Sequence, residues 1–132
     1  MARVFTPAEA KHLDLPGRSS VEILSREKGS HSVTLRLVEI PVNDASTAER
    51  LPHSHSDFEE CIFVLSGHGV TRADSGEYAL KTGDTIWIPA GEKHYTRNTG
   101  DLPLRLLCFF PVGDIASGTS EFMPTSAPPT AL

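Results

Sequence analysis

The feature of this sequence that most constrains its fold is an alternation of apolar and polar residues, with a period of two, between Ser19 and Phe110. The alternation occurs in short runs that end at clusters of Gly, Pro, Asn, Asp or Ser, which are residues that form turns. The predicted strands are Val21–Ser25, Val33–Ile40, Leu51–His55, Glu60–Leu65, Val70–Ala73, Tyr78–Leu80, Thr85–Ile88, His94–Asn98 and Leu104–Phe110. Short strands at this regular spacing predict an all-β sandwich or barrel.

Two segments outside this pattern flank the predicted strands. Thr6-Pro7-Ala8-Glu9 is a capping-box sequence with proline at the first helical position, and it predicts a short helix that ends near His12. After Pro111 the residues are mainly Gly, Ser, Thr, Pro and Ala, which bury little surface and predict an irregular tail. Phe122 and Met123 are expected to anchor this tail to the domain or to a neighbouring subunit. We therefore expect an N-terminal helix and arm over 1–18, one barrel over 19–112 and a tail over 113–132.

Composition excludes several classes of partner. The chain has 132 residues, of which 39% are hydrophobic, and this suffices for one core. Asp and Glu number 17 against 12 Lys and Arg, without a basic cluster, so nucleic acid is not an expected partner. No stretch is apolar enough to span a membrane or to act as a signal peptide. Cys61 and Cys108 lie far apart, unlike a zinc knuckle or a disulfide scaffold, so we expect a cytoplasmic protein.

The residues with the clearest chemical signal are three histidines and one glutamate. His53 and His55 are two apart on a predicted strand, so their side chains share one face. Glu60 has the parity of the apolar residues that follow it, which predicts an interior carboxylate that needs a cation or hydrogen-bond donors. His94 begins a further predicted strand. One strand histidine alone is more often a core or surface residue, but this set has the spacing of metal ligands.

The same residues carry a resemblance to a known family. His53-Ser54-His55, four residues, Glu60, six residues and Gly67 reproduce the first cupin motif, except that Thr47 replaces its leading glycine. Gly83, five residues, Pro89-Ala90-Gly91, two residues, His94, three residues and Asn98 match the second cupin motif throughout. The chain therefore resembles a small single-domain cupin over about residues 33–110. That resemblance implies an all-β fold of the cupin type, a double-stranded β-helix or jelly-roll barrel.

The resemblance also implies a ligand set. His53, His55, Glu60 and His94 are the expected ligands of one divalent transition metal, which agrees with the parity of their strands. Three imidazoles and a carboxylate suit Fe, Mn, Ni, Zn, Co or Cu, and the sequence does not choose among them. An octahedral ion with four protein ligands keeps two open positions for a substrate, or for a substrate and O2.

Strand parity places further side chains around the expected metal. Charged Arg105 should face outward, which directs Leu106, Cys108 and Phe110 inward. Ile62 has the parity of the expected carboxylate ligand and should lie beside it. These inward residues are candidates for the wall of a substrate pocket.

Arg36 is a further pocket candidate that parity does not place. Both faces of its strand carry apolar residues, so either face could be internal. Facing inward, Arg36 could hold a substrate carboxylate through two hydrogen bonds. Facing outward, it would be a solvated charge near a strand edge.

An apolar outer face is predicted on the strand that follows the histidine pair. Cys61, Phe63 and Leu65 have the parity opposite to that of the interior residues. An exposed apolar flank indicates a partner, and a symmetric homodimer is the commonest such assembly.

Three hypotheses for the function stay open at this point. The first is a metalloenzyme, in the dioxygenase, lyase or isomerase class, that acts on a small oxygenated or carboxylate substrate. The second is a non-catalytic cupin that binds a small ligand or sugar and retains its metal site. In the third, the metal only stabilises the fold. The fold does not select among these activities.

Overall fold

The computed structural model describes residues 1–43, 53–55 and 57–121, and it is all-β. Three short 3-10 turns accompany the strands, at Pro7–Glu9, Arg26–Lys28 and Ala116–Gly118. The strands are β1 Lys11–Leu15, β2 Arg18–Leu24, β3 Thr34–Ile40, β4 His53–His55, β5 Glu60–Ser66, β6 His68–Ala73, β7 Gly76–Lys81, β8 Thr85–Ile88, β9 His94–Asn98, β10 Leu104–Phe110 and β11 Thr119–Glu121.

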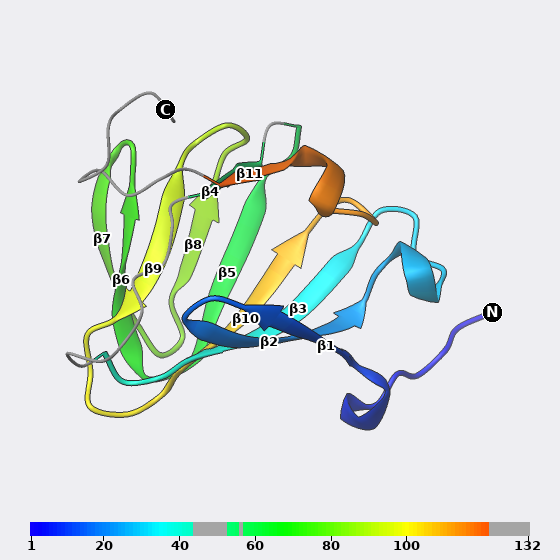
Figure 1. Cartoon of the computed structure of the whole chain (residues 1–132), viewed down its shortest axis with the longest axis horizontal. Coiled ribbons are helices and arrows are strands. Elements are labelled where there is room, and N and C mark those ends of the chain that lie inside the picture. Colours follow the sequence, from blue (N-terminus) through cyan, green and yellow to red (C-terminus); the bar gives the residue numbers. More distant parts are fainter. Residues whose placement is uncertain (44–52, 56, 122–132) are drawn as a thin grey trace.

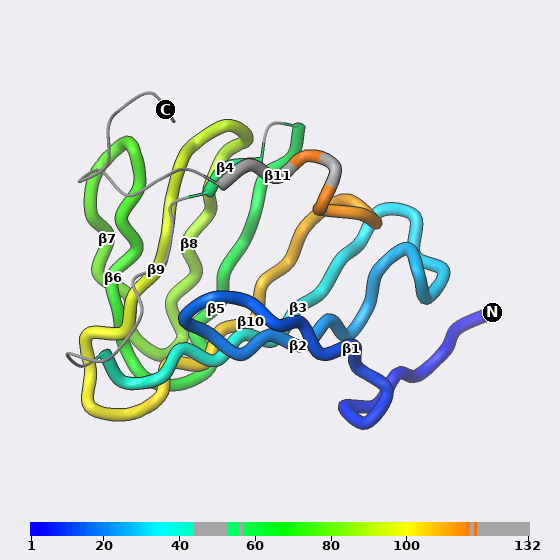
Figure 2. Tube along the Cα trace, in the orientation of Figure 1, coloured from blue at the N-terminus to red at the C-terminus, as the bar shows by residue number. Residues whose placement is uncertain are grey.

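The strands form two antiparallel sheets that share one core (Figure 1). The six-stranded sheet has the order β1-β2-β3-β10-β5-β8, and the five-stranded sheet has the order β11-β4-β9-β6-β7. Strands distant in sequence are neighbours, since β10 pairs with both β3 and β5. Figure 2 follows the chain as it passes repeatedly between the two sheets. This double-sheet arrangement is the cupin-like fold that the sequence predicts.

Alternating side chains divide each strand into an inner and an outer face. In β5, Glu60, Ile62 and Val64 are buried, whereas Phe63 and Leu65 are exposed. The core combines residues of both sheets, because Leu80 of the five-stranded sheet belongs to the same buried cluster as Ile62 and Val64. The period-two prediction from the sequence is therefore confirmed on this strand, and it fixes which residues face the site.

The predicted N-terminal helix is wrong beyond its first turn. The capping box is present, with the Thr6 backbone N–H donating to Glu9 at 2.6 Å, but the turn ends at Glu9. Residues 11–15 form β1, which pairs with β2 along its whole length. The physical reason is the hairpin: Gly17 has a φ of 70°, and the tight turn lets β1 pair its backbone with β2.

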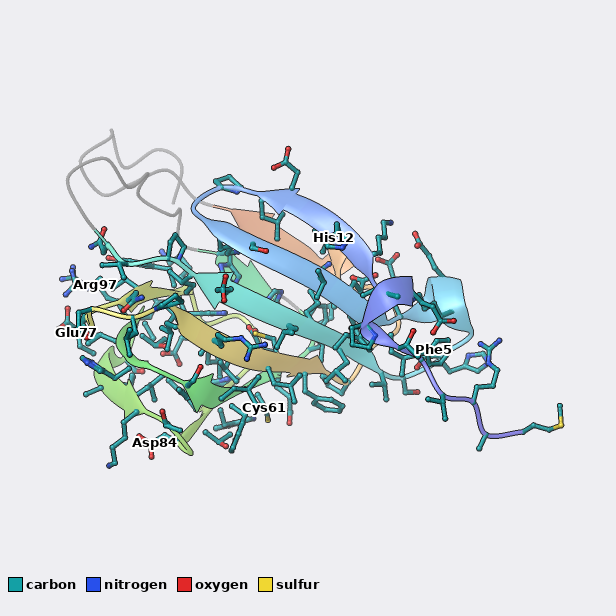
Figure 3. The ribbon with its side chains drawn as sticks, turned by 90° about the horizontal axis from the view of Figure 1, so that it is seen from below. Phe5, His12, Cys61, Glu77, Asp84 and Arg97 are labelled. Atoms are coloured by element: carbon teal, nitrogen blue, oxygen red, sulfur yellow. The ribbon has the colours of Figure 1, made fainter. Side chains whose placement is uncertain are left out.

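Phe5 lies at the opposite end of the molecule from Glu77 and Arg97 (Figure 3).

The segment after the barrel is less irregular than predicted. Residues 119–121 form β11, which pairs with β4 at one edge of the five-stranded sheet (Figure 1). Strand addition at an edge uses backbone hydrogen bonds, so a segment without apolar side chains can still be ordered by it. Thr47, Phe122 and Met123, which the sequence analysis singled out, lie outside the described residues.

Turns and one buried amide hold the strands that carry the site. Gly67, Gly83 and Gly91 have φ values of 86°, 92° and 86°, a left-handed conformation that favours glycine at these turns. The Asn98 side chain donates to the carbonyl oxygens of Ile40 and Leu102 at 3.1 and 2.8 Å, so it braces the turn between β9 and β10. Within the described part of the chain, no helix is long and apolar enough to cross a membrane.

Candidate metal centre

Four side chains from three strands converge inside the barrel. His53 and His55 lie on β4, Glu60 opens β5 and His94 opens β9. Their candidate ligand atoms all lie within 4.8 Å of one another. The pairing of His53 with His94 across β4 and β9 brings two of them together, and the strand period adds His55. The structure thus gathers all four residues that the motifs selected.

Glu60 contacts two of the three histidines of the cluster. Its Oε1 lies 2.9 Å from Nε2 of His94 and 3.2 Å from Nε2 of His55. The ring of His53 packs against that of His94 with 4.2 Å between centroids. Glu60, His55 and His94 are each at most 4% exposed, whereas His53 is half-buried at the cavity surface. The carboxylate therefore faces imidazole nitrogens in an environment with little water.

The hydrogen bond that Nδ1 of His94 makes with the backbone determines the chemistry open to Nε2, the inner nitrogen that faces Glu60. Nδ1 of His94 lies 2.9 Å from the carbonyl oxygen of Glu92, and a carbonyl can only accept, so Nδ1–H donates. In a neutral imidazole this leaves Nε2 with a lone pair directed at the Glu60 oxygen. Two lone pairs at 2.9 Å repel each other unless a proton or a metal ion lies between them. A proton, which would make His94 a charged donor to Glu60, or a metal ion satisfies this pair, and in metal sites ligand histidines are likewise oriented by a carbonyl.

The environment of Glu60 keeps its carboxyl group ionised. Burial acts to raise the pKa of Glu60, but hydrogen bonds with His55 and His94 and the charges of His94 and His53 outweigh burial. The pKa of Glu60 is consequently held well below its ordinary value. At neutral pH the cluster offers one negative charge to a cation.

The spacing of the cluster is near that of the ligands of a single ion. Two ligands at about 2.1 Å from one ion lie at most about 4.2 Å apart. The candidate ligand atoms here lie within 4.8 Å of one another, slightly beyond that limit, so binding of one ion requires the side chains to move inward by a few tenths of an ångström. His53, His55, Glu60 and His94 could therefore hold one divalent transition metal.

Two phenylalanines enclose the cluster on its buried side. Phe58 stacks on His55 with 4.8 Å between ring centroids, and Phe110 meets the same imidazole edge-on at 5.2 Å. Both phenylalanines are buried. They fix the orientation of His55 and lower the local dielectric constant, which strengthens the attraction between a carboxylate and a cation.

The cluster lies in the wall of a cavity of about 220 Å³. All pocket candidates from the sequence line this cavity, namely Arg36, Ile62, Leu106, Cys108 and Phe110. The position of Arg36, which parity left open, is therefore on the inner face. Its Nε and Nη2 both lie 2.9 Å from one carboxylate oxygen of Glu22.

Part of the cavity wall comes from outside the two motifs and was not predicted from the sequence. Leu15, Arg18 and Ser20 of the N-terminal hairpin line the cavity, as do Ile115 and Ala116 beyond β10. One signal could have found the hairpin residues: Leu13 and Leu15 have the period of a strand, and Pro16-Gly17 is a turn sequence.

Several residues lie outside the cavity. Arg105 is exposed on the outer face of β10, as parity predicts, and Trp87 is 58% exposed on β8. Arg97 is exposed on β9 and His68 is exposed at the start of β6. None of them contributes to the metal cluster.

The fold and the cluster together define a double-sheet β-barrel protein with an internal three-histidine, one-glutamate site. A family model described as the cupin domain matches residues 36–110. The chain belongs to the cupin family.

Three curated relatives resemble the chain over all or part of its length. An uncharacterized protein of Aquifex aeolicus is 30% identical over 118 residues, which cover 84% of this chain and 91% of that protein. An uncharacterized protein of Methanocaldococcus jannaschii is 38% identical over 61 residues, 46% of this chain and 49% of that protein. The oxalate-binding protein of Thermotoga maritima is 33% identical over 55 residues, 42% of this chain and 46% of that protein. The chain thus spans about half the length of two of these relatives.

Solved structures of low identity share the fold. A nucleoside dehydratase, Pac13 of Streptomyces, aligns with a TM-score of 0.75 at 15% identity, over 98% of this chain and 99% of that chain. Oxalate decarboxylase of Bacillus subtilis aligns with a TM-score of 0.72 at 22% identity, over 86% of this chain and 30% of that chain. At these identities the likeness concerns the fold alone.

Replacing one histidine tests the cluster. We expect the His53→Ala variant to bind Co²⁺ at least about 100-fold more weakly than the wild type, because one imidazole ligand is lost. His53 is the least buried of the four residues, so its removal disturbs the core least. Isothermal titration calorimetry gives the affinity, and His12→Ala, an exposed histidine on β1, is the control. Unchanged affinity in His53→Ala would contradict the assignment.

Proposed function

We propose that this cupin is a metal-dependent enzyme that acts on a small oxygenated or carboxylate compound. The observation that carries the proposal is the convergence of three imidazoles on one buried, ionised carboxylate in the wall of a cavity. The contact between Nε2 of His94 and the Glu60 oxygen, which in a neutral imidazole opposes two lone pairs, suits a cation between the two atoms. A cavity of about 220 Å³ is smaller than the pockets of roughly 300–1,000 Å³ that bind drug-sized ligands, which favours a small substrate.

The residues around the cavity have different roles in the proposed reaction. A divalent ion held by the cluster would supply Lewis-acid chemistry, or activation of O2 if it is redox-active. Ile62, Leu106 and Phe110 give the cavity apolar walls that exclude water. Arg36 adds a positive charge on the same cavity surface and can attract an anionic substrate. Among the described residues that line the cavity, Glu60 alone has a carboxyl group. The chain therefore offers few groups of its own for proton transfer there.

The comparisons favour a carboxylate among the possible substrates. One relative is named an oxalate-binding protein, and one structural neighbour is an oxalate decarboxylase. Another neighbour is a nucleoside dehydratase, so related folds also carry out redox-neutral elimination chemistry. We infer a lyase, isomerase or dioxygenase reaction on a small acid.

The second candidate function is a binding protein that holds such a compound without converting it. The name of the oxalate-binding relative is the observation that favours it. In a third case the ion only stabilises the barrel by linking β4, β5 and β9.

One experiment separates the three cases. The wild type and His53→Ala are loaded with Fe²⁺, Mn²⁺ or Zn²⁺ and incubated with a pool of small carboxylic and sugar acids, and each acid is quantified over time. We expect metal-dependent loss of one acid with the wild type and none with His53→Ala. Saturable binding of an acid without its loss would establish the binding protein instead. A lower melting temperature on chelation, with neither binding nor loss, would leave a structural ion.

We also propose that two copies of the chain associate through the outer face of the six-stranded sheet. Side chains there are apolar and contiguous across strands: Phe109 is opposite both Leu35 and Cys61, and Cys61 is opposite Trp87. Phe63 is 39% exposed on this face. A contiguous apolar face of this kind favours burial against a second copy.

A charge placed on that face tests the dimer. We expect the wild type to have twice the chain mass in light scattering at micromolar concentration, and Phe63→Asp to be a monomer because a carboxylate would be buried in the interface. Tyr78→Asp is the matched control, since Tyr78 is 41% exposed on the other sheet and should leave the dimer intact. A monomeric wild type would overturn the proposal.

A further inference from the structure

The wall of the metal cavity that faces the N-terminal hairpin has its own polar character. Arg18 and Ser20 of β2 and Arg36 of β3 line the cavity together with the metal cluster. Arg18 and Ser20 lie outside residues 36–110, the part that matches the family model. This wall is therefore supplied largely by a feature of this chain that the family pattern does not specify.

The Ser20 hydroxyl is a buried polar group without a partner. Ser20 is 2% exposed, and its Oγ makes no hydrogen bond to any of the described residues. A buried hydroxyl in that condition is destabilising, so it is rare unless a ligand or water satisfies it. Because Ser20 also lines the cavity, a ligand in the cavity is within reach of its hydroxyl.

Glu22 balances the charge of Arg36, but it does not engage all of the N–H donors of the Arg36 guanidinium. Its Nε and Nη2 contact one oxygen of Glu22, and the pair is largely buried. A guanidinium has five N–H donors, and the contacts of Arg36 within the described residues engage it with Glu22 alone. The remaining donors can bind a second anion without breaking the pair with Glu22.

The charges of this wall favour an anion. Arg36 and Glu22 form an ion pair, and Arg18 brings a second guanidinium, whose Nη1 donates to the carbonyl oxygen of Pro16 at 2.9 Å. The planar guanidinium also matches the two oxygens of a carboxylate.

We propose that Ser20, Arg18 and Arg36 form a carboxylate subsite in the metal cavity, so that the ligand is a dicarboxylate with one acid group at the metal and the other at this subsite. The inference rests on the proposed function, because it places one end of the ligand at the metal. Ser20 and Arg36 donate hydrogen bonds to the far carboxylate, and Arg18 adds charge. They are specificity-determining residues for the proposed substrate.

The strand register sets the separation of the two ends. Arg36 is opposite Cys108, and Cys108 is opposite Ile62, which is two residues from Glu60. Two strand spacings separate β3 from β5, or roughly 10 Å between backbones, and the side chains reach inward from each. A dicarboxylate of several carbons is the ligand that we propose for this separation.

The test compares two acids of equal length on protein loaded with Co²⁺. Succinate and butyrate each have one carboxylate for the metal, whose visible spectrum reports that contact, but succinate alone has a second. We expect succinate to bind at least about ten-fold more tightly than butyrate in calorimetry, owing to the charge-assisted hydrogen bonds of the subsite. We expect inorganic phosphate to bind more weakly than succinate.

Two variants locate the preference. In Ser20→Ala and in the double variant Glu22→Gln/Arg36→Gln, which removes the charge pair together, the preference for succinate should fall to a few-fold or less. Co²⁺ should bind as it does to the wild type, because none of these three residues is a candidate metal ligand. Ser20→Ala should also keep or raise the melting temperature, because it removes a buried unpartnered hydroxyl, whereas a purely structural serine would lower it. Arg105→Gln, an exposed arginine of β10, is the control and should keep the preference.

The outcomes separate the two proposals. Binding of Co²⁺ without a preference for succinate, or a preference that survives in both variants, overturns the subsite and leaves the proposed function standing. Tighter binding of phosphate that depends on Ser20 overturns the assignment to carboxylate. Failure to bind Co²⁺ or any other divalent transition metal overturns the proposed function itself, and the dicarboxylate inference with it.

Discussion

The contact on which the site depends is the one between Glu60 and the histidine nitrogens. A carboxylate buried beside His55 and His94 would be costly to keep ionised without hydrogen bonds or a cation. The carbonyl of Glu92 fixes the proton of His94 on Nδ1, so the inner nitrogen presents a lone pair to that carboxylate. A divalent ion satisfies the carboxylate and the imidazoles together. The barrel brings β4, β5 and β9 into the register that makes this contact possible.

Much of this arrangement could be predicted because the barrel core obeys the period of a strand. The strands at 85–88, 94–98 and 104–110 have the predicted bounds, since each is bounded by glycine or proline turns, and the burial of their residues alternates. The same alternation put Glu60 on the inner face with Ile62. Spacing along the chain was sufficient to select the four cluster residues, because a motif constrains residue types at positions that the fold later brings together.

The N-terminal hairpin was not predicted, and the reason is physical. Its first strand follows a genuine capping-box turn at Thr6, and local hydrogen bonds of that kind are identical in a single turn and in a longer helix. Pairing with β2, a non-local interaction, decides the outcome. In β2 the polar residues Ser20 and Glu22 are the buried ones, while Val21 and Ile23 are only half-buried on the other face. Because the buried residues of β2 are polar, a prediction that assigns apolar residues to the interior does not find this part of the cavity wall.

The measurement that tests the central claim most directly is metal K-edge X-ray absorption on the protein loaded with one equivalent of Co²⁺. We predict nitrogen and oxygen ligands at about 2.0–2.2 Å, as found for imidazole and carboxylate donors, with the outer-shell scattering that imidazole rings produce. That scattering should correspond to three imidazoles for the cluster of His53, His55 and His94. A spectrum of a hydrated ion without imidazole scattering would contradict the claim that these residues form a metal centre.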